Sequence, residues 1–292
     1  MIDLIIPTLS QGLLWSLLAL GVYITFRVLD FADMTVEGSF PLGAAICVYF
    51  LIRDHHPLLA LLAAGLLGGV AGIVTGLLHT KLRIPSLLAG ILSMIALYSV
   101  NLRIMGKANG SLLGKETAFT YMETLGLDYA QSVFIVGLLA TVVIGTLIYW
   151  FFGTEIGAAI RATGFNPQMI RAQGIDTNVM LLLGLFLSNA LTAMAGAFIG
   201  MNNGFFDVGM GVGTIVIGLA SVIIGEVLFG TRSFKNSLVS VILGSIVYRF
   251  VIAIVLQMGM PPNDLKLFTS VLVVIALALP MMRDKVQRRK VG

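Results

Sequence analysis

The chain has 292 residues, of which 58% are hydrophobic and 11% charged, with a formal net charge of +4. Soluble proteins carry about 25% charged residues, so this composition excludes an ordinary water-facing surface and, with it, a cytosolic enzyme. Apolar residues come in blocks of about 15 to 25 separated by short polar breaks, which indicates several membrane spans and no soluble domain. The block at 58–78 is apolar on every side rather than alternating, which favours helices over a barrel.

Nine apolar blocks predict the spans of an all-α polytopic membrane protein with about eight or nine transmembrane helices, in one domain over residues 1–292. The second and seventh blocks are shorter than the roughly 20 residues that a straight spanning helix needs. We expect these two to be broken, tilted or only partly inserted. The blocks lie near residues 4–26, 38–52, 58–79, 86–102, 132–152, 178–201, 213–229, 237–258 and 267–282.

The stretch DFADMTVEGSF at 30–40 places three carboxylates, followed by Pro41, where a continuous span would otherwise run. Carboxylates and a proline within a span are typical of a broken helix. Broken helices often line a transport pathway, because their free backbone groups can bind solute. A simple cytoplasmic turn, capped by a nearby Asp or Thr, fits the residues equally well. Asp33 and Glu37 are therefore candidates for the pathway or for an intramembrane ion pair.

Basic residues predict the orientation of the spans. If alternate connections share a side, the sides hold unequal numbers of Lys and Arg, and the richer side is cytoplasmic. The basic tail 283–292 is then cytoplasmic, the N-terminus is external, and the chain is a multi-pass protein of the plasma or inner membrane. The richer side holds Arg27, Lys81, Arg83, Arg161, Arg171, Arg232, Lys235, Arg283, Lys285, Arg288, Arg289 and Lys290; the other holds Arg53, Arg103, Lys107, Lys115 and Lys266.

Glycine spacing predicts close helix contacts. Gly68, Gly72 and Gly76 recur every four residues in the third block, and Gly196 and Gly200 do so in the sixth. Small residues at this spacing let helix backbones approach each other in membranes. We expect both sets to face another helix.

The segment at 153–176 lies between two spans and is too long for a hairpin turn. Its residues predict two short helices. The first would begin near Glu155 and stop at Gly164, and the second would open with Pro167, a favoured first helical position, and end at Gly174.

Arg161 and Arg171 would be exposed on this segment. A short helix lying across the membrane face with basic residues exposed suits a docking surface. The alternative is a solvated linker with ordinary basic residues, which is what charged cytoplasmic loops usually are.

The segment resembles the coupling-helix loop of ABC importer permeases of the branched-chain amino acid and ribose type. That loop contains a Glu, an Arg-Ala pair, a Gly-x-Asn-Pro and a closing Ala-x-Gly-Ile. Further stretches resemble the family in chain order, at 29–44, 191–200, 221–230 and 261–266, the last two being closest to a subgroup of uncharacterised permeases. The loop matches here are Glu155, Arg161-Ala162, Gly164-Phe165-Asn166-Pro167 and Ala172-Gln173-Gly174-Ile175.

The resemblance implies a permease that pairs with a second copy, in a homodimer, with two cytoplasmic ATP-binding subunits and an external solute-binding protein. The chain has no Gly-x-x-x-x-Gly-Lys-Ser/Thr loop, so we expect no cofactor here, with ATP and Mg²⁺ on the partner subunits. Its role would be mechanical, with 153–176 as the ATPase-coupling segment. The subgroup resemblance implies an amino acid substrate of the aromatic class, and no nucleic acid partner is expected.

Arg249 lies within an apolar span, where a charge costs about 2.5 kcal/mol or more. Glu226 in the preceding span is a candidate partner, although the two differ in predicted depth, so Asp33 and Glu37 remain alternatives. The pair would fix helix register. Two other interpretations remain: the guanidinium of Arg249 binds a substrate carboxylate, or it snorkels to the membrane interface.

Two other functions remain open from the residues alone. A self-contained secondary transporter or channel would need ion-coupling carboxylates at the midplane, whereas the carboxylates here cluster at span ends. An intramembrane enzyme would need a nucleophile and base or a metal set. The single cysteine, Cys47, and three scattered histidines supply neither a disulfide nor a metal motif.

Overall fold

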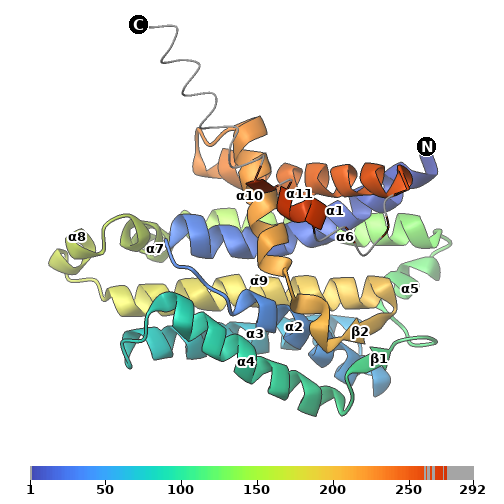
Figure 1. Ribbon diagram of the computed structural model, residues 1–292, viewed down its shortest axis with the longest axis horizontal. Helices are drawn as coiled ribbons and strands as arrows, with labels where there is room; N and C mark the ends of the chain where they lie inside the picture. Colours follow the sequence, from blue (N-terminus) through green and yellow to red (C-terminus); the bar gives the residue numbers. More distant parts are fainter. Residues whose placement is uncertain (1, 260, 262–263, 265–266, 272, 275–292) are drawn as a thin grey trace, which may run out of the picture.

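The computed structural model describes residues 2–259, 261, 264, 267–271 and 273–274. Within this range the protein is a helical bundle with one short antiparallel ribbon (Figure 1). The long helices are α1 (Ile2–Tyr23), α2 (Val36–Ile52), α3 (Pro57–Thr80), α4 (Ser86–Met105), α6 (Tyr129–Phe152), α9 (Thr177–Asn203), α10 (Thr214–Phe229) and α11 (Phe234–Gln257). The short elements are the π-helical turn η1 (Ile24–Val28), β1 (Asn109–Ser111), α5 (Ala118–Glu123), α7 (Glu155–Phe165), α8 (Pro167–Ala172), β2 (Phe205–Asp207) and the 3₁₀ turn η2 (Val208–Gly211).

The described residues contain seven helical segments long and apolar enough to cross a bilayer, rather than the eight or nine expected. The difference arises chiefly at α2, which has 17 residues and is too short for that criterion. Of the ninth predicted block, only 267–271 and 273–274 are described, and they are helical. The rest of that block and the tail 283–292 lie outside the described residues. The all-α polytopic membrane class is confirmed.

Helix α9 runs through the middle of the bundle, between α1 and α6 on one side and α3 and α4 on the other (Figure 1). The glycine prediction is confirmed here. A Cβ atom on Gly72 would collide with the carbonyl oxygen of Leu185, and one on Gly196 would collide with that of Phe40. Helices α3 and α2 therefore pack backbone to backbone against opposite parts of α9, which only glycine permits.

The chain leaves the helical conformation between η1 and α2. Residues 29–35 are not helical, yet Phe31, Asp33 and Thr35 in this segment are buried. Asp33 contacts Asn189, which lies twelve residues, or about 18 Å, from the start of α9. The break therefore lies well inside the bundle. It precedes Pro41, which sits within α2, so the proline is not the cause of the break.

Helix α10 also begins inside the bundle. The chain enters from β2 through η2, and the backbone of Gly211 packs against the carbonyl oxygen of Glu37 in the first turn of α2. The second and seventh blocks are short because the helices they form, α2 and α10, both start in the interior of the bundle. The N-termini of these two helices lie close together.

The two ends of the bundle differ in their connections (Figure 1). The α8 end contains α7, α8 and the turns at 81–85 and 230–233. The ribbon end contains β1, β2, α5 and the turn at 53–56. The described basic residues of the richer set, from Arg27 to Lys235, fall at the α8 end, as the alternation of connections requires.

Candidate functional site

Helix α7 begins as predicted but extends further. The side chain of Thr154 accepts a hydrogen bond from the N–H of Gly157 at 3.3 Å, which caps the helix before Glu155. Gly164 was expected to stop this helix, but α7 continues through it to Phe165. The reason for glycine is packing: a Cβ at Gly164 would collide with the carbonyl oxygen of Val28 and the backbone of Leu29. Gly164 thus allows α7 to pack closely against residues 28–29, which lead into the break at 29–35.

Helix α8 begins at Pro167 as predicted and ends at Ala172, two residues before the predicted end at Gly174. Asn166 accepts a hydrogen bond from the N–H of Met169 at 3.0 Å, and Pro167 is the first helical residue. Gly174, after the helix, has a φ of +83°, a conformation that favours glycine. Ile170 is buried beneath the helix, whereas Phe165 is 92% exposed and Met169 is 45% exposed. An apolar tip therefore projects from this end of the molecule.

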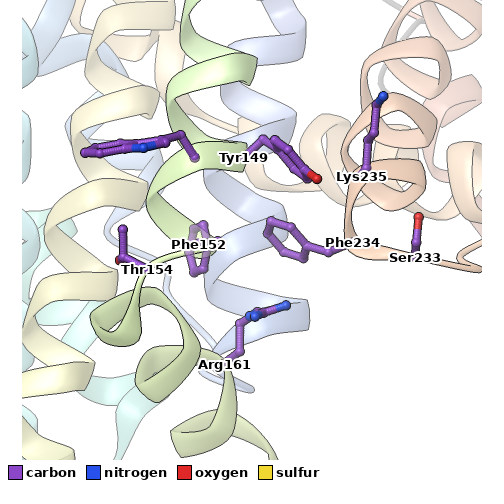
Figure 2. A pocket seen from close by; sticks show the side chains of 9 residues that line it. Tyr149, Phe152, Thr154, Arg161, Ser233, Phe234 and Lys235 are labelled. Atoms are coloured by element: carbon purple, nitrogen blue, oxygen red, sulfur yellow. The ribbon is translucent and has the colours of Figure 1, made fainter.

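The two arginines of the segment have different surroundings. The Nε of Arg171 donates to the hydroxyl of Thr177 at 2.7 Å, which ties α8 to the first residue of α9. The guanidinium of Arg161 lies 5.1 Å from the centre of the Phe234 ring at the start of α11. Figure 2 shows Arg161 below Phe152 and Phe234, at the edge of a cavity rather than on the α8 tip. Ala162, next to it, is half-buried.

The predicted pair of Arg249 with Glu226 is wrong. Glu226 forms an ion pair with Arg27, which lies in η1, the π-helical turn that follows α1. In the described part of the chain, the Nε and Nη2 atoms of Arg249 have no hydrogen-bond partner. Its guanidinium lies 3.9 Å from the centre of the Trp15 ring. The depth difference decides this outcome, because Glu226 sits in the last turn of α10 while Arg249 is far along α11.

Asp33 belongs instead to a buried hydrogen-bond network. Its Oδ1 accepts from the N–H of Thr35 at 2.9 Å, and its Oδ2 accepts from Nδ2 of Asn189 at 2.7 Å. Asn189 in turn accepts from the hydroxyl of Ser39 at 2.7 Å. The hydroxyl of Thr35 extends this network through a hydrogen bond with the hydroxyl of Thr75, at an oxygen–oxygen distance of 2.7 Å, and so links the break to α3. Asp33 is therefore the anchor of the break rather than a partner of Arg249.

Glu37 faces the other interior helix start. Its Oε1 accepts a hydrogen bond from the N–H of Gly213, the residue that caps α10, at 3.0 Å. Glu37 also lines a cavity of about 460 Å³ between α2, α4 and η2, together with Tyr98 and Asn101. The Oδ1 of Asn101 is buried and has no partner among the described residues.

Sequence reasoning missed three partners of these groups. Asn189 and Trp15 occupy apolar runs, and nothing in the sequence singles out Trp15 from packing residues. Arg27 was recognised only as a mark of sidedness. A Ser-Asn pair within an otherwise apolar span, as at Ser188 and Asn189, is the one signal that could have pointed to the network.

Comparison with known proteins identifies the class. The family described as "Branched-chain amino acid transport system / permease component" matches residues 4–278. The chain belongs to this family: it is the permease component of an ABC importer and is not itself catalytic. ATP is bound by separate ATPase subunits in this family, and an ABC permease also implies a solute-binding partner.

Individual relatives extend over most of the chain. It is 40% identical over 274 residues to a tyrosine transport system permease protein of Clostridioides difficile (strain R20291), covering 94% of this chain and 90% of the relative. It is 32% identical over 287 residues to an uncharacterised protein of Rickettsia prowazekii (strain Madrid E), covering 97% and 99%. Among solved structures, an ABC transporter assigned to the metal-chelate type, in an inward-facing conformation, aligns with a TM-score of 0.53 and 13% identity, covering 96% of this chain and 85% of that one.

Proposed function

We propose that the chain imports an aromatic amino acid, in the class of tyrosine, by alternating access driven by two ATPase subunits that dock on α8. The substrate class is supported by the likeness to the tyrosine transport permease. The proposal takes the α8 end to be cytoplasmic, in accordance with the excess of basic residues there. It also includes a second copy of the chain, as a homodimer, and an external solute-binding protein at the ribbon end.

The observation that carries the docking assignment is the way α8 is held. The apolar tip at the α7–α8 junction, Phe165 and Met169, is exposed, while the chain is fixed on both sides of it. Before the tip, Gly164 at the end of α7 packs against Leu29, which leads into the break at Asp33. After it, Arg171 in α8 contacts the start of α9. A displacement of α8 by a docked subunit would therefore be transmitted to both the break and the central helix.

The cavity beside Glu37 is our candidate for part of the solute pathway. It lies where α2 and α10 begin, as in transporters whose discontinuous helices line the solute site. The carboxylate of Glu37 can pair with the ammonium group of an amino acid, and the ring of Tyr98 can pack against an aromatic side chain. Tyr98 is the residue to test first, because it lines the cavity without holding a helix start.

The test of docking uses the transporter reconstituted with its ATPase subunits in vesicles. The variant Phe165→Ala/Met169→Ala is expected to reduce association with the ATPase and to abolish transport, because the exposed apolar tip is lost. The matched control is Leu113→Ala/Leu125→Ala, which removes two exposed apolar side chains at the ribbon end. Bulky residues at Gly164 and Gly174 should uncouple ATP hydrolysis from transport. Undiminished association and transport in the tip variant would refute the docking assignment.

A further inference from the structure

A cavity of about 600 Å³ lies at the α8 end between the last turn of α6, the start of α7 and the start of α11 (Figure 2). Its lining does not include Phe165 or Met169 of the apolar tip, although a neighbouring cavity that shares Arg161 and Phe234 with it is lined by Phe165. Phe152 and Phe234 form its wall, with ring centres 5.1 Å apart. Its lining residues are Tyr149, Trp150, Phe152, Gly153, Thr154, Arg161, Ser233, Phe234 and Lys235.

The charges at this cavity are all of one sign. Arg161 and Lys235 both line it, and its lining contains no carboxylate. In the described part of the chain neither cation takes part in an ion pair. The cavity also lies at the N-termini of α7 and α11, whose caps are Thr154 and Ser233, and at the C-terminus of α6. Helix N-termini carry partial positive charge and C-termini partial negative charge, so the net positive charge of the cavity rests on the two side chains.

The cavity opens where the membrane surface must lie. Tyr149 and Trp150 are in the last turn of the spanning helix α6, and Trp150 is 69% exposed while Tyr149 is 49% exposed. Exposed Tyr and Trp at the end of a span occupy the level of the lipid headgroups. Basic pockets between spanning helices at the cytoplasmic surface are known to bind acidic headgroups.

We propose that this cavity binds the phosphate of an anionic phospholipid, with Arg161 and Lys235 around the headgroup and Trp150 along the first part of the acyl chain. The aromatic rim distinguishes the lipid from an acidic loop of a docked protein, because the exposed Tyr149 and Trp150 lie at the end of a span, at the level of the lipid headgroups. Arg161 then serves the membrane contact and not ATPase docking. The proposal does not depend on the identity of the transported solute.

The experiment uses the purified full chain in phosphatidylcholine vesicles that contain brominated phosphatidylglycerol. Bromine quenches nearby tryptophan, and the difference between the wild type and Trp150→Phe isolates the signal of Trp150. The wild type is expected to show stronger quenching by brominated phosphatidylglycerol than by brominated phosphatidylcholine at equal mole fraction. The variant Arg161→Gln/Lys235→Gln should lower the relative affinity for the anionic lipid by about 10-fold to 30-fold.

The matched control is Lys81→Gln/Arg83→Gln, which removes two exposed basic residues from the same end of the bundle, outside the cavity lining. It should keep the preference for the anionic lipid. Soluble glycerol phosphate at millimolar concentration should fail to displace the lipid; displacement would assign the site to a soluble phosphate. An equal preference in the cavity variant and the wild type would overturn the proposal. The same variant is also tested for association with the ATPase subunits added to these vesicles. If it keeps the lipid preference and loses only this association, the cavity is assigned to an acidic peptide and the proposal is overturned.

Discussion

The Oε1 atom of Glu37 accepts a hydrogen bond from the backbone N–H of Gly213 at 3.0 Å. The first turn of α2 thereby supplies the negative charge at the N-terminus of α10, where both helices start inside the bundle. A carboxylate in this position stabilises the partial positive charge of a helix start. Two breaks that are far apart in the sequence are thus held together by one side chain.

This relationship predicts a graded loss of stability. Glu37→Gln keeps an acceptor but removes the charge, and we expect the free energy of unfolding to fall by about 0.3–1 kcal/mol. Glu37→Leu also leaves the Gly213 N–H unpaired, and the loss should be about 1–3 kcal/mol. Thermal unfolding in detergent measures both. Glu116→Gln, at an exposed position of the ribbon end, is the control and should change nothing; equal stability of all four proteins would show that Glu37 does not support α10.

The glycines that contact α9 should not tolerate even a methyl group. Gly72→Ala places a Cβ against the carbonyl oxygen of Leu185 and 2.9 Å from Nδ2 of Asn189. We expect a loss of about 1–3 kcal/mol, as for other overpacked cores. Gly145→Ala is the control, since its Cβ would meet only a side-chain carbon of Ile242 at 3.7 Å. It should be neutral or stabilising by up to about 1 kcal/mol, because alanine suits a helix better. Unfolding measurements that rank the two in the opposite order would contradict the packing.

The network around Asp33 should behave as a unit. Asn189→Ala removes the donor to Asp33 and the acceptor of Ser39, and should lower the free energy of unfolding by about 1–3 kcal/mol. Ser39→Ala should cost about 1 kcal/mol. The double variant should lose less than the sum of the two, because Ser39 has already lost its partner in Asn189→Ala. A double-variant cycle by thermal unfolding checks this, and strict additivity would count against a shared network.

Arg249 should respond to substitution as a buried cation that has no ion-pair partner among the described residues. Exchanging the residues at 249 and 226 should not restore a functional protein, because Glu226 is paired with Arg27. Arg249→Met keeps a long side chain next to Trp15 and removes two donor atoms that lack hydrogen-bond partners in the described part of the chain, so stability should be unchanged or increased. Normal transport by Arg249→Met would assign Arg249 a structural role, whereas loss of transport at unchanged stability would assign it to solute binding. If stability fell by several kcal/mol, the guanidinium would have a partner that supports the fold.

The sequence predicted the features that follow from local rules. Apolar block length located the long helices, four-residue glycine spacing located the contacts with α9, and the Asn-Pro pair located the start of α8. The two short blocks also indicated correctly that α2 and α10 are irregular. These signals depend only on the residues of one segment and its neighbours.

The remaining features depend on side chains that meet from distant segments. Gly164 was assigned to a helix stop because glycine often ends helices, but its neighbour is the backbone at Val28, more than a hundred residues earlier. The partner of Glu226 could not be derived from span order, because η1 brings Arg27 to the end of α10. The role of Asn189 depends on the helix break at 29–35, and the hydrophobic periodicity of the sequence does not show how deep in the bundle this break lies.

The ribbon of β1 and β2 constrains how such a bundle can move. It pairs Asn109 with Asp207 and Ser111 with Phe205, so it joins the ends of α4 and α9 that lie farthest from α8. A second link at this end runs from the hydroxyl of Tyr129 to the carbonyl of Asn202 at 3.0 Å. Because that end is held, we expect a displacement of α8 to tilt α9 about the ribbon, with the largest movement at the α8 end and the smallest at the ribbon end.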